Sequence, residues 1–292
     1  MSRQSLKRLV DGLTHLVLIC AVVIALFPVF WILSTSFKPK PEVFSTELYL
    51  FPKTFTLDNY NYVMGLTTKI STREGSQEIN LFVRWLTNSL IVAGATTIIG
   101  VVLAAGTAYA FSRFQFLGRR AALGSFLVTQ MFPGAILLVP LYNLLNQLGL
   151  LNSWPGLVLA YCTTALPFSV WMLKSFFDTI PVDLEEAATV DGANPIGAFV
   201  RIILPLALPG IAVAAFYNFM TAWNEFLMAL TFMTGEASQT LPVGLRRFVF
   251  QFATDWHYMS AGAVIVTVPV LIMFFLAQRY LISGLTAGGV KG

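Results

Sequence analysis

Charged residues are scarce in this chain. Lysine, arginine, aspartate and glutamate together make up 11% of its 292 residues, while hydrophobic types make up 57%. Ordinary soluble domains carry about 25% charged residues, because a surface in water needs them. The composition therefore excludes a soluble globular enzyme and a disordered chain, and it indicates a membrane protein. The net charge of +4 includes no Lys/Arg run, which argues against a nucleic-acid site.

Cysteine and histidine are also scarce. The two cysteines, Cys20 and Cys162, lie inside apolar stretches, and the two histidines, His15 and His257, are far apart in the sequence. Neither a disulfide framework nor a metal cluster can be built from these four residues. We therefore expect no metal and no cofactor.

The motifs of nucleotide-binding proteins and of common enzymes are missing. No Gly-Lys dipeptide occurs, which excludes the phosphate-binding loop G-x-x-x-x-G-K-[ST]. The sequence also has no H-E-x-x-H, G-x-S-x-G or G-x-G-x-x-G. We expect no enzymatic activity, and any energy derived from ATP must come from a partner.

Long uncharged runs give the chain its organisation. They cover residues 12–37, 85–112, 121–173, 202–224 and 256–278, and a membrane-spanning helix needs about 20 apolar residues. The run 121–173 is too long for one helix, and turn-forming residues near 146–156 divide it. We predict an all-α polytopic membrane protein with six spans, near 13–37, 86–111, 121–145, 155–177, 203–232 and 259–282. A signal peptide is the alternative for the first span, but its apolar stretch is too long.

Basic residues predict the orientation of the spans. Arg113, Arg119 and Arg120 lie in the short second loop, and Arg3, Lys7 and Arg8 precede the first span. Cytoplasmic loops of membrane proteins carry an excess of such residues. We therefore expect both termini and the second loop in the cytoplasm, with residues 38–84 and 233–258 on the outer side.

The fourth loop, residues 178–201, is acidic and is expected on the cytoplasmic side. Asp183 suits an N-cap with Glu186 three residues later, and Gly192 suits a left-handed helix end. Asn194-Pro195 suits a second helix start. The loop is predicted to form two short helices around a glycine turn. Such a pair suggests a docking site for a soluble partner, and the alternative is a solvated connector.

The residues of this loop fit a long, gapped pattern: Glu186-Ala187-Ala188, Gly192 and the group Ile202, Leu204, Pro205. The pattern resembles the EAA signature of binding-protein-dependent ABC importer permeases, and the preceding Asp191 is also typical of it. The resemblance covers roughly residues 85–282. Three further segments are similar to MalG-type permeases of maltose/maltodextrin transporters, at residues 26–38, 222–226 and 284–292.

The resemblance implies a type I importer permease fold. Residues 1–84 would hold the first span and an outer loop, 85–282 the transmembrane domain with its coupling loop 178–205, and 283–292 a cytoplasmic tail. The chain would pair with a MalF-like permease, two ATP-binding cassette ATPases and an extracytoplasmic solute-binding protein, in a bacterial cytoplasmic membrane. It would translocate a sugar, of the maltose/maltodextrin type or related, by alternating access. The alternatives are another small solute of the same family, or a secondary transporter.

The resemblance assigns ATPase coupling to residues of the loop, listed as Glu186, Ala187, Ala188, Asp191, Gly192, Leu204 and Pro205. Elsewhere two hypotheses stay open for each candidate. Trp223, Asn224 and Glu225 would line the solute pathway or a gate, or form an interfacial acid with a tryptophan anchor. Tyr142, Asn143 and Asn146 share one helical face, which would line a polar path or pack against a partner.

The second outer loop, residues 233–258, is the last candidate. Its polar start suits an exposed tip, and Pro242 with Gly244 suits a stiffened return to the membrane. The resemblance implies that such a loop contacts the solute-binding protein, here through Gly235, Glu236 and Pro242. The alternative is a passive connector.

Overall fold

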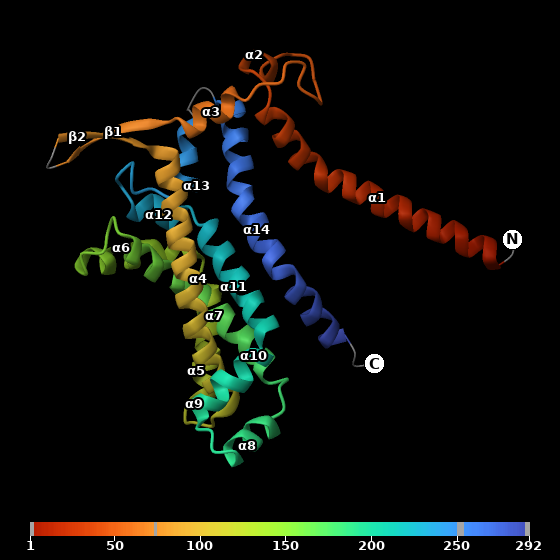
Figure 1. The fold of residues 1–292 in the computed structure, drawn as a ribbon, viewed down its shortest axis with the longest axis vertical. Coiled ribbons are helices and arrows are strands. Elements are labelled where there is room, and N and C mark those ends of the chain that lie inside the picture. The colour runs from red at the N-terminus through yellow and green to blue at the C-terminus, as the bar shows by residue number, and fades with distance from the viewer. Residues whose placement is uncertain (1–2, 73–74, 250–253, 290–292) are drawn as a thin grey trace. The chain divides into compact units, whose positions relative to one another are not determined.

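A computed structural model describes residues 3–72, 75–249 and 254–289 of the chain. Two compact units make up the fold (Figure 1). Unit 1 holds residues 1–66 and 245–268, and unit 2 holds residues 67–244 and 269–292. Helix α14, Trp256–Gly289, contributes to both units.

Unit 1 begins with a long apolar helix, α1, Arg3–Ser36. Its part Val10–Ser36 is long and apolar enough to cross a membrane, and its most apolar window has no buried residue. A helix that is apolar all round and uncovered suits a lipid environment. The short helices α2, Lys40–Val43, and α3, Asp58–Met64, follow it. The buried Asn59 amide donates hydrogen bonds to the carbonyls of Ser36 and Lys38, and so ties α3 to the end of α1.

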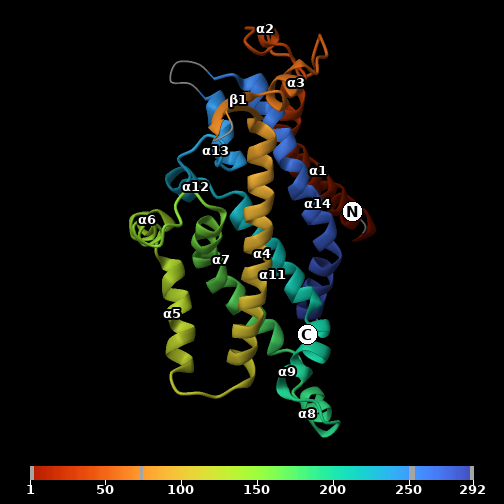
Figure 2. The same ribbon diagram turned by 60° about the vertical axis from the view of Figure 1, so that its left-hand side comes forward.

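Unit 2 is built around three helices that lie side by side (Figures 1 and 2): α4, Leu81–Arg113; α7, Trp154–Phe177; and α11, Leu208–Trp223. Small residues of α4 allow this close contact. At Gly100, a Cβ would clash with the side-chain amide of Asn218. Asn218 is buried and donates to the Ser169 hydroxyl at 2.8 Å. Small residues with interhelical hydrogen bonds are typical of packing between membrane helices.

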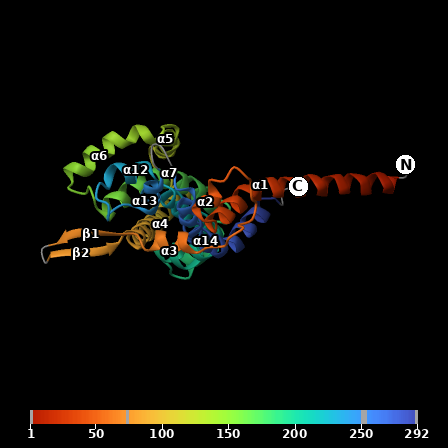
Figure 3. The ribbon, with the colours of Figure 1, turned by 90° about the horizontal axis from the view of Figure 1, so that it is seen from above.

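Two of the six predicted spans are bent. Helix α5, Arg119–Met131, is followed by a 3-10 turn, η1, Gly134–Leu137, and by α6, Leu138–Gln147, with a bend of 99°. Pro133 lies at this break, and proline cannot continue the hydrogen bonding of α5. The span predicted near 121–145 is therefore a bent pair of helices rather than one continuous helix. Figure 3 shows α6 projecting outward from α4.

The predicted span near 203–232 is also broken. It contains α10, Leu204–Leu206, then α11 after a bend of 80°, and then α12, Leu227–Phe232. Pro205 and Pro209 lie on either side of the bend. Among the described residues four helices are long and apolar enough to cross a membrane, or six spans if each bent pair counts as one.

The polar segment 38–84 contains structure that its sequence did not predict. Strands β1, Thr67–Thr72, and β2, Gly75–Asn80, form an antiparallel hairpin in which Thr67 pairs with Asn80. Beyond it, α13, Leu241–Leu245, and η3, Arg246–Phe248, precede α14. The hairpin is small beside the helices, so the all-α fold class stands.

Candidate functional site

The acidic loop forms the predicted pair of short helices at one end of unit 2 (Figures 1 and 2). Helix α8 covers Asp183–Val190 and α9 covers Pro195–Ala198, followed by a π-helical turn, η2, Phe199–Ile203. Gly192 has a φ of 87°, the left-handed conformation expected at a helix end. The Asn194 side chain accepts a hydrogen bond from the Gly197 backbone N–H at 2.7 Å. The glycine turn and the Asn194-Pro195 start are confirmed.

The predicted N-cap of α8 is wrong by one residue. The helix begins at Asp183 itself, and Val182 is the N-cap residue, without a side-chain hydrogen bond. Asp183, Glu185 and Glu186 instead occupy the first turn. Carboxylates there stabilise a helix through its dipole, by about 0.3–1 kcal/mol each at exposed sites. The acidity of the loop thus has a local structural reason.

Glu185 anchors the helical pair to α4, and the sequence analysis did not single it out. Its carboxylate forms an ion pair with Arg113 and accepts a hydrogen bond from the Tyr109 hydroxyl at 2.7 Å. The side chains of Arg113 and Glu185 are only 9% and 13% exposed. Arg113 also donates to the carbonyl of Ile180 at 3.0 Å. In the sequence, Arg113 stands out only as a basic residue at the end of an uncharged run, which indicates the orientation of the spans.

A second polar link joins the same elements at Asp178. Its carboxylate accepts hydrogen bonds from Ser112 at 2.7 Å and from Lys174 at 2.5 Å. Partial burial raises the pKa of Asp178, but these two hydrogen bonds outweigh it and hold the pKa below its usual value. The stabilisation is therefore present above the pKa of an unfolded aspartate. It is lost as the pH falls through the lower folded-state pKa.

The predicted coupling residues divide into an exposed set and a buried set. Glu186, Ala187, Asp191, Gly192 and Pro205 are exposed, Leu204 is half-buried and Ala188 is buried. Large apolar side chains are exposed beside them, since Val190 is 88% and Ile196 is 74% exposed. We call Glu186, Val190, Ile196 and Val200 the loop face. Exposed apolar side chains near carboxylates on this helical pair suit an interface with another protein.

The outer-loop candidates lie at the opposite end of unit 2 (Figure 2). Gly235 and Glu236 are exposed, and Pro242 is half-buried in α13. Two side chains of α4 hold the backbone of this loop. Trp85 donates to the Glu236 carbonyl at 2.7 Å, and Asn88 donates to the carbonyls of Ala237 and Gln239 at 2.9 and 2.8 Å. The tip is thus held in one shape.

The return of this loop is a helix rather than a turn. Leu241–Leu245 is helical, and its backbone begins with a hydrogen bond from the Leu241 N–H to the Ser89 hydroxyl at 2.7 Å. Gly244 is needed for another reason than the predicted turn. A Cβ at Gly244 would lie 2.2 Å from the Trp85 ring, so only glycine fits there.

Two of the three residues predicted to line a pathway or gate, Asn224 and Glu225, form hydrogen bonds with nearby backbone groups. Trp223 is 1% exposed, whereas Asn224 is exposed and donates to the Met220 carbonyl at 2.9 Å. The Glu225 carboxylate accepts hydrogen bonds from the N–H groups of Met228 and Ala229 at 2.9 and 3.0 Å. Glu225 thus satisfies the first turn of α12. A role in a gate stays a prediction.

A groove of about 470 Å³ opens on the helices of unit 2, and its lining is more apolar than polar. Its lining includes hydroxyl and amide side chains from α5, α7 and α11, listed as Thr129, Gln130, Thr163, Thr164, Tyr217 and Thr221. Gln130 donates to the Thr164 carbonyl at 3.1 Å, and the Tyr217 ring lies 4.3 Å from that of Phe168. Tyr142, Asn143 and Asn146 are not among the described lining residues. Sequence reasoning missed this groove because its members come from segments far apart in the sequence, with η1 and α6 also contributing to the lining.

The described residues contain no group of three or more His, Cys, Asp or Glu side chains placed to hold a metal ion. Cys20 is exposed on α1 and Cys162 is buried in α7.

Comparison with known proteins adds a family and relatives. A family model described as "Binding-protein-dependent transport system inner membrane component" matches residues 97–286. The trehalose transport system permease protein SugB of Mycobacterium tuberculosis is 41% identical over 92% of this chain and 93% of its own length. The trehalose/maltose transport system permease protein MalG of Thermococcus litoralis is 36% identical over the full length of both chains.

Solved structures show the same fold. A chain of a bacterial ABC transporter involved in alginate import matches with a TM-score of 0.80, covering 96% of this chain and 99% of that one at 21% identity. A chain from an alginate transporter in complex with an alginate pentasaccharide-bound periplasmic protein matches with a TM-score of 0.68, at 94% and 95% coverage and 18% identity. These likenesses confirm the predicted fold of an importer permease.

Proposed function

The chain belongs to the family of binding-protein-dependent transport system inner membrane components, and we propose that it forms half of the channel through which an ATP-driven importer moves a sugar. The full-length similarity to permease proteins makes it a transport subunit rather than an enzyme. The observation that carries the sugar assignment is the 41% identity with a trehalose permease across 92% of the chain.

The proposed substrate is a neutral disaccharide or short oligosaccharide of the maltose or trehalose type. The relatives named above transport trehalose or maltose by their descriptions. The groove supports this choice through the hydroxyl and amide side chains in its lining and the Tyr217 ring, which suit an uncharged polyhydroxylated ring. No acidic or basic side chain is among the described residues that line it.

The proposed partners are a second, MalF-like permease, two ATPases and an extracytoplasmic solute-binding protein. The alginate transporter complex with its periplasmic protein supports the last of these. The loop face supports the ATPases, since it exposes Val190 and Ile196 beside Glu186. In this arrangement both termini and residues 178–205 lie in the cytoplasm, as the basic residues of the second loop indicate.

The proposed mechanism is alternating access driven by the ATPases. Closure of the ATPases would move the loop face, and the polar links to α4 would pass that movement on. Arg113 with Glu185 and Ser112 with Asp178 join the loop to the end of α4. Rigid α4 would then re-aim its other end, where Trp85 and Asn88 hold the outer loop.

Uptake measurements test the assignment. Cells of the source organism that lack this chain should lose uptake of one neutral disaccharide among labelled trehalose, maltose, maltotriose and a galacto-oligosaccharide. Labelled methionine serves as the control solute, because its uptake should stay unchanged. Undiminished uptake of every sugar, with loss of a non-sugar solute, would contradict the substrate class and leave the permease assignment standing.

The outer loop gives a second test, with a defined deletion. Removing residues 235–239 should leave membrane insertion and ATPase association unchanged, because the loop lies at the far end of unit 2 from α8 and α9 (Figure 2). Uptake should fall at least tenfold, and stimulation of ATP hydrolysis by the binding protein should be lost. Both activities can be measured in proteoliposomes. Normal uptake at limiting sugar concentration would make the loop a passive connector.

A further inference from the structure

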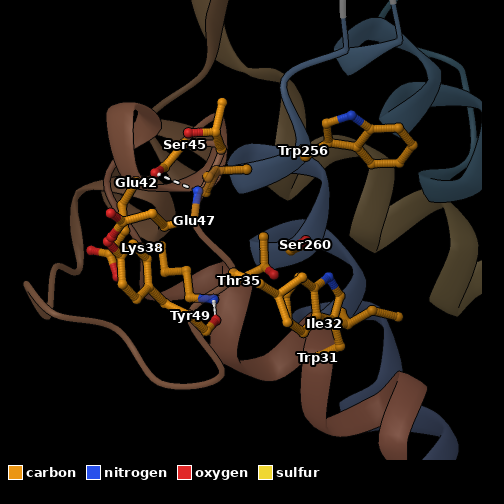
Figure 4. Close-up of a pocket in the computed structure, with 13 residues that line it drawn as sticks. Trp31, Ile32, Thr35, Lys38, Glu42, Ser45, Glu47, Tyr49, Trp256 and Ser260 are labelled. Carbon is orange, nitrogen blue, oxygen red and sulfur yellow. Dashed lines mark hydrogen bonds between the residues drawn. The ribbon is translucent and has the colours of Figure 1, made fainter.

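Unit 1 contains a cavity that the transport function does not explain. It has a volume of about 450 Å³ and lies between the end of α1, the segment after it and the start of α14 (Figure 4). The candidate membrane span of α1 ends at Ser36, and that of α14 begins at Trp256. Trp31, Tyr49 and Trp256 are among its lining residues. Tryptophan and tyrosine at the ends of spans mark the level of the lipid headgroups.

A buried ammonium group lies in this cavity. Lys38 is 3% exposed, and its Nζ donates to the Tyr49 carbonyl at 2.5 Å and lies 4.6 Å from the centroid of the Trp31 ring. An ammonium has three N–H donors, and the described residues supply one hydrogen-bond acceptor and no ion pair for it. Burial lowers the pKa of Lys38, and the charge of Glu42 counteracts this only in part. Because buried charges are normally paired, the site favours an anionic group on its ligand.

Carboxylates lie across the same cavity. Figure 4 shows Glu42 and Glu47 on the side of the loop, away from Trp256. Glu42 accepts hydrogen bonds from the backbone N–H groups of Lys53 and Thr54 at 2.6 and 3.3 Å. Glu47 is exposed and lies 3.6 Å from the Lys53 ammonium. Each carboxylate oxygen can accept two hydrogen bonds, so both acids retain acceptors for a cationic group. A purely anionic ligand would meet two negative charges here.

Two of the aromatic rings at this cavity already contact ammonium groups. Lys38 lies over the Trp31 ring, and the Lys53 ammonium lies 3.7 Å from the centroid of the Tyr49 ring. One face of each of these two rings is thus already occupied by an ammonium group. The apolar side chain of Leu48 also lines the cavity and is 76% exposed. Exposed apolar residues at headgroup level offer surface for acyl chains.

We propose that this cavity binds the headgroup of a zwitterionic phospholipid that carries a primary amine. The lipid phosphate would pair with the buried ammonium of Lys38, and the lipid amine would donate to Glu42 and Glu47 at the rim. The acyl chains would leave along Leu48 and the outer surface of α1. The ligand chemistry is thus a phosphate and an ammonium a few bonds apart, which phosphatidylethanolamine has and phosphatidylglycerol lacks.

Lipid retention by the intact transporter tests this site. The complex of this chain with its partner subunits is reconstituted in nanodiscs that contain equal amounts of phosphatidylethanolamine, phosphatidylcholine and phosphatidylglycerol. It is then released from them with its bound lipids. Retained lipids are then counted by native mass spectrometry. We expect the wild-type complex to retain phosphatidylethanolamine in preference to both others, and Lys38→Gln to reduce that retention at least fivefold. Phosphatidylcholine should bind more weakly, because its quaternary ammonium has no N–H to donate to the acids.

Two further variants separate the site from general effects. Lys40→Gln is the matched control, because Lys40 is basic and lies in unit 1 in an exposed ion pair with Asp255 but does not line the cavity. It should retain lipid as the wild type does. Glu47→Gln, at an exposed side chain that tolerates change, should shift retention toward phosphatidylglycerol even if Lys38→Gln fails to assemble. Equal retention in all variants, a preference for phosphatidylglycerol in the wild type, or displacement of lipid by maltose would each overturn the proposal.

Discussion

Replacing Gly192 with valine is expected to remove the ATPases from the purified transporter and to abolish uptake. Gly192 has a φ of 87° between α8 and α9, with open space around it. A left-handed backbone costs other residues roughly 1–2 kcal/mol, and branched residues suffer most. That strain alone corresponds to about a 5–30-fold loss of the native loop shape. Co-purification of the ATPase and sugar uptake in proteoliposomes measure the effect.

Gly118 provides a matched control for this substitution. It has a φ of 86° before α5 and likewise has nothing within 4 Å of its Cβ position. Gly118→Val therefore imposes the same backbone strain outside the helical pair, and it should keep ATPase association near the wild-type level. Equal losses in both variants would mean that strain acts on the whole fold. Wild-type uptake by a stably inserted Gly192→Val protein would contradict the docking role.

The second large effect is expected from Glu185→Ala. This change leaves the guanidinium of Arg113, only 9% exposed, without its carboxylate. Removing one partner of a buried ion pair costs about 3–5 kcal/mol. The helical pair should detach from α4, so that the thermal unfolding temperature falls and uptake is lost. Thermal unfolding of the detergent-solubilised complex and uptake in proteoliposomes measure the two consequences.

A double variant tests whether the unpaired charge of Arg113, rather than a loss of contact area, destabilises the Glu185→Ala protein. The double variant Arg113→Met with Glu185→Leu removes both charges and keeps apolar volume, so it should recover much of the unfolding temperature. Asp178→Ala is the comparison for an exposed pair, because the Asp178 side chain is 42% exposed. Exposed pairs contribute about 0–1 kcal/mol, and its effect should be smaller. A Glu185→Ala protein as stable as the wild type would contradict the anchor.

The positions of the apolar helices and the helical pair of the acidic loop could be predicted from the sequence, because both depend on local signals. Absent charges mark apolar helices, and Gly192 with Asn194-Pro195 fixes a turn and a start within a few residues. The shape of the third and fifth spans could not be predicted in this way. Pro133 and Pro205 were visible, but proline is tolerated inside membrane helices. Pro28, Pro167 and Pro269 lie within continuous helices.

Contacts between distant segments were beyond the sequence. Glu185 meets Arg113, and Trp85 meets the backbone at Glu236, across 72 and 151 positions of the chain. Neither contact produces a periodic pattern in the amino-acid sequence. The same holds for Gly244, whose glycine is required by the Trp85 ring rather than by its own backbone angle. Side-chain pairing of this kind depends on the packed fold.

The two ends of helix α4 contact the two candidate interfaces, the outer loop and the helical pair α8 and α9. Its 33 residues span about 50 Å at roughly 1.5 Å per residue. Trp85 and Asn88 form hydrogen bonds with the outer loop near one end. Tyr109 and Arg113 bind Glu185 of the helical pair at the other end. Each residue of an α-helix turns the rod by about 100°, since 3.6 residues complete a turn. The two pairs of residues therefore keep a fixed angle to one another about the helix axis. A single residue added between them would rotate one pair by about 100° relative to the other, so that it no longer faced its loop.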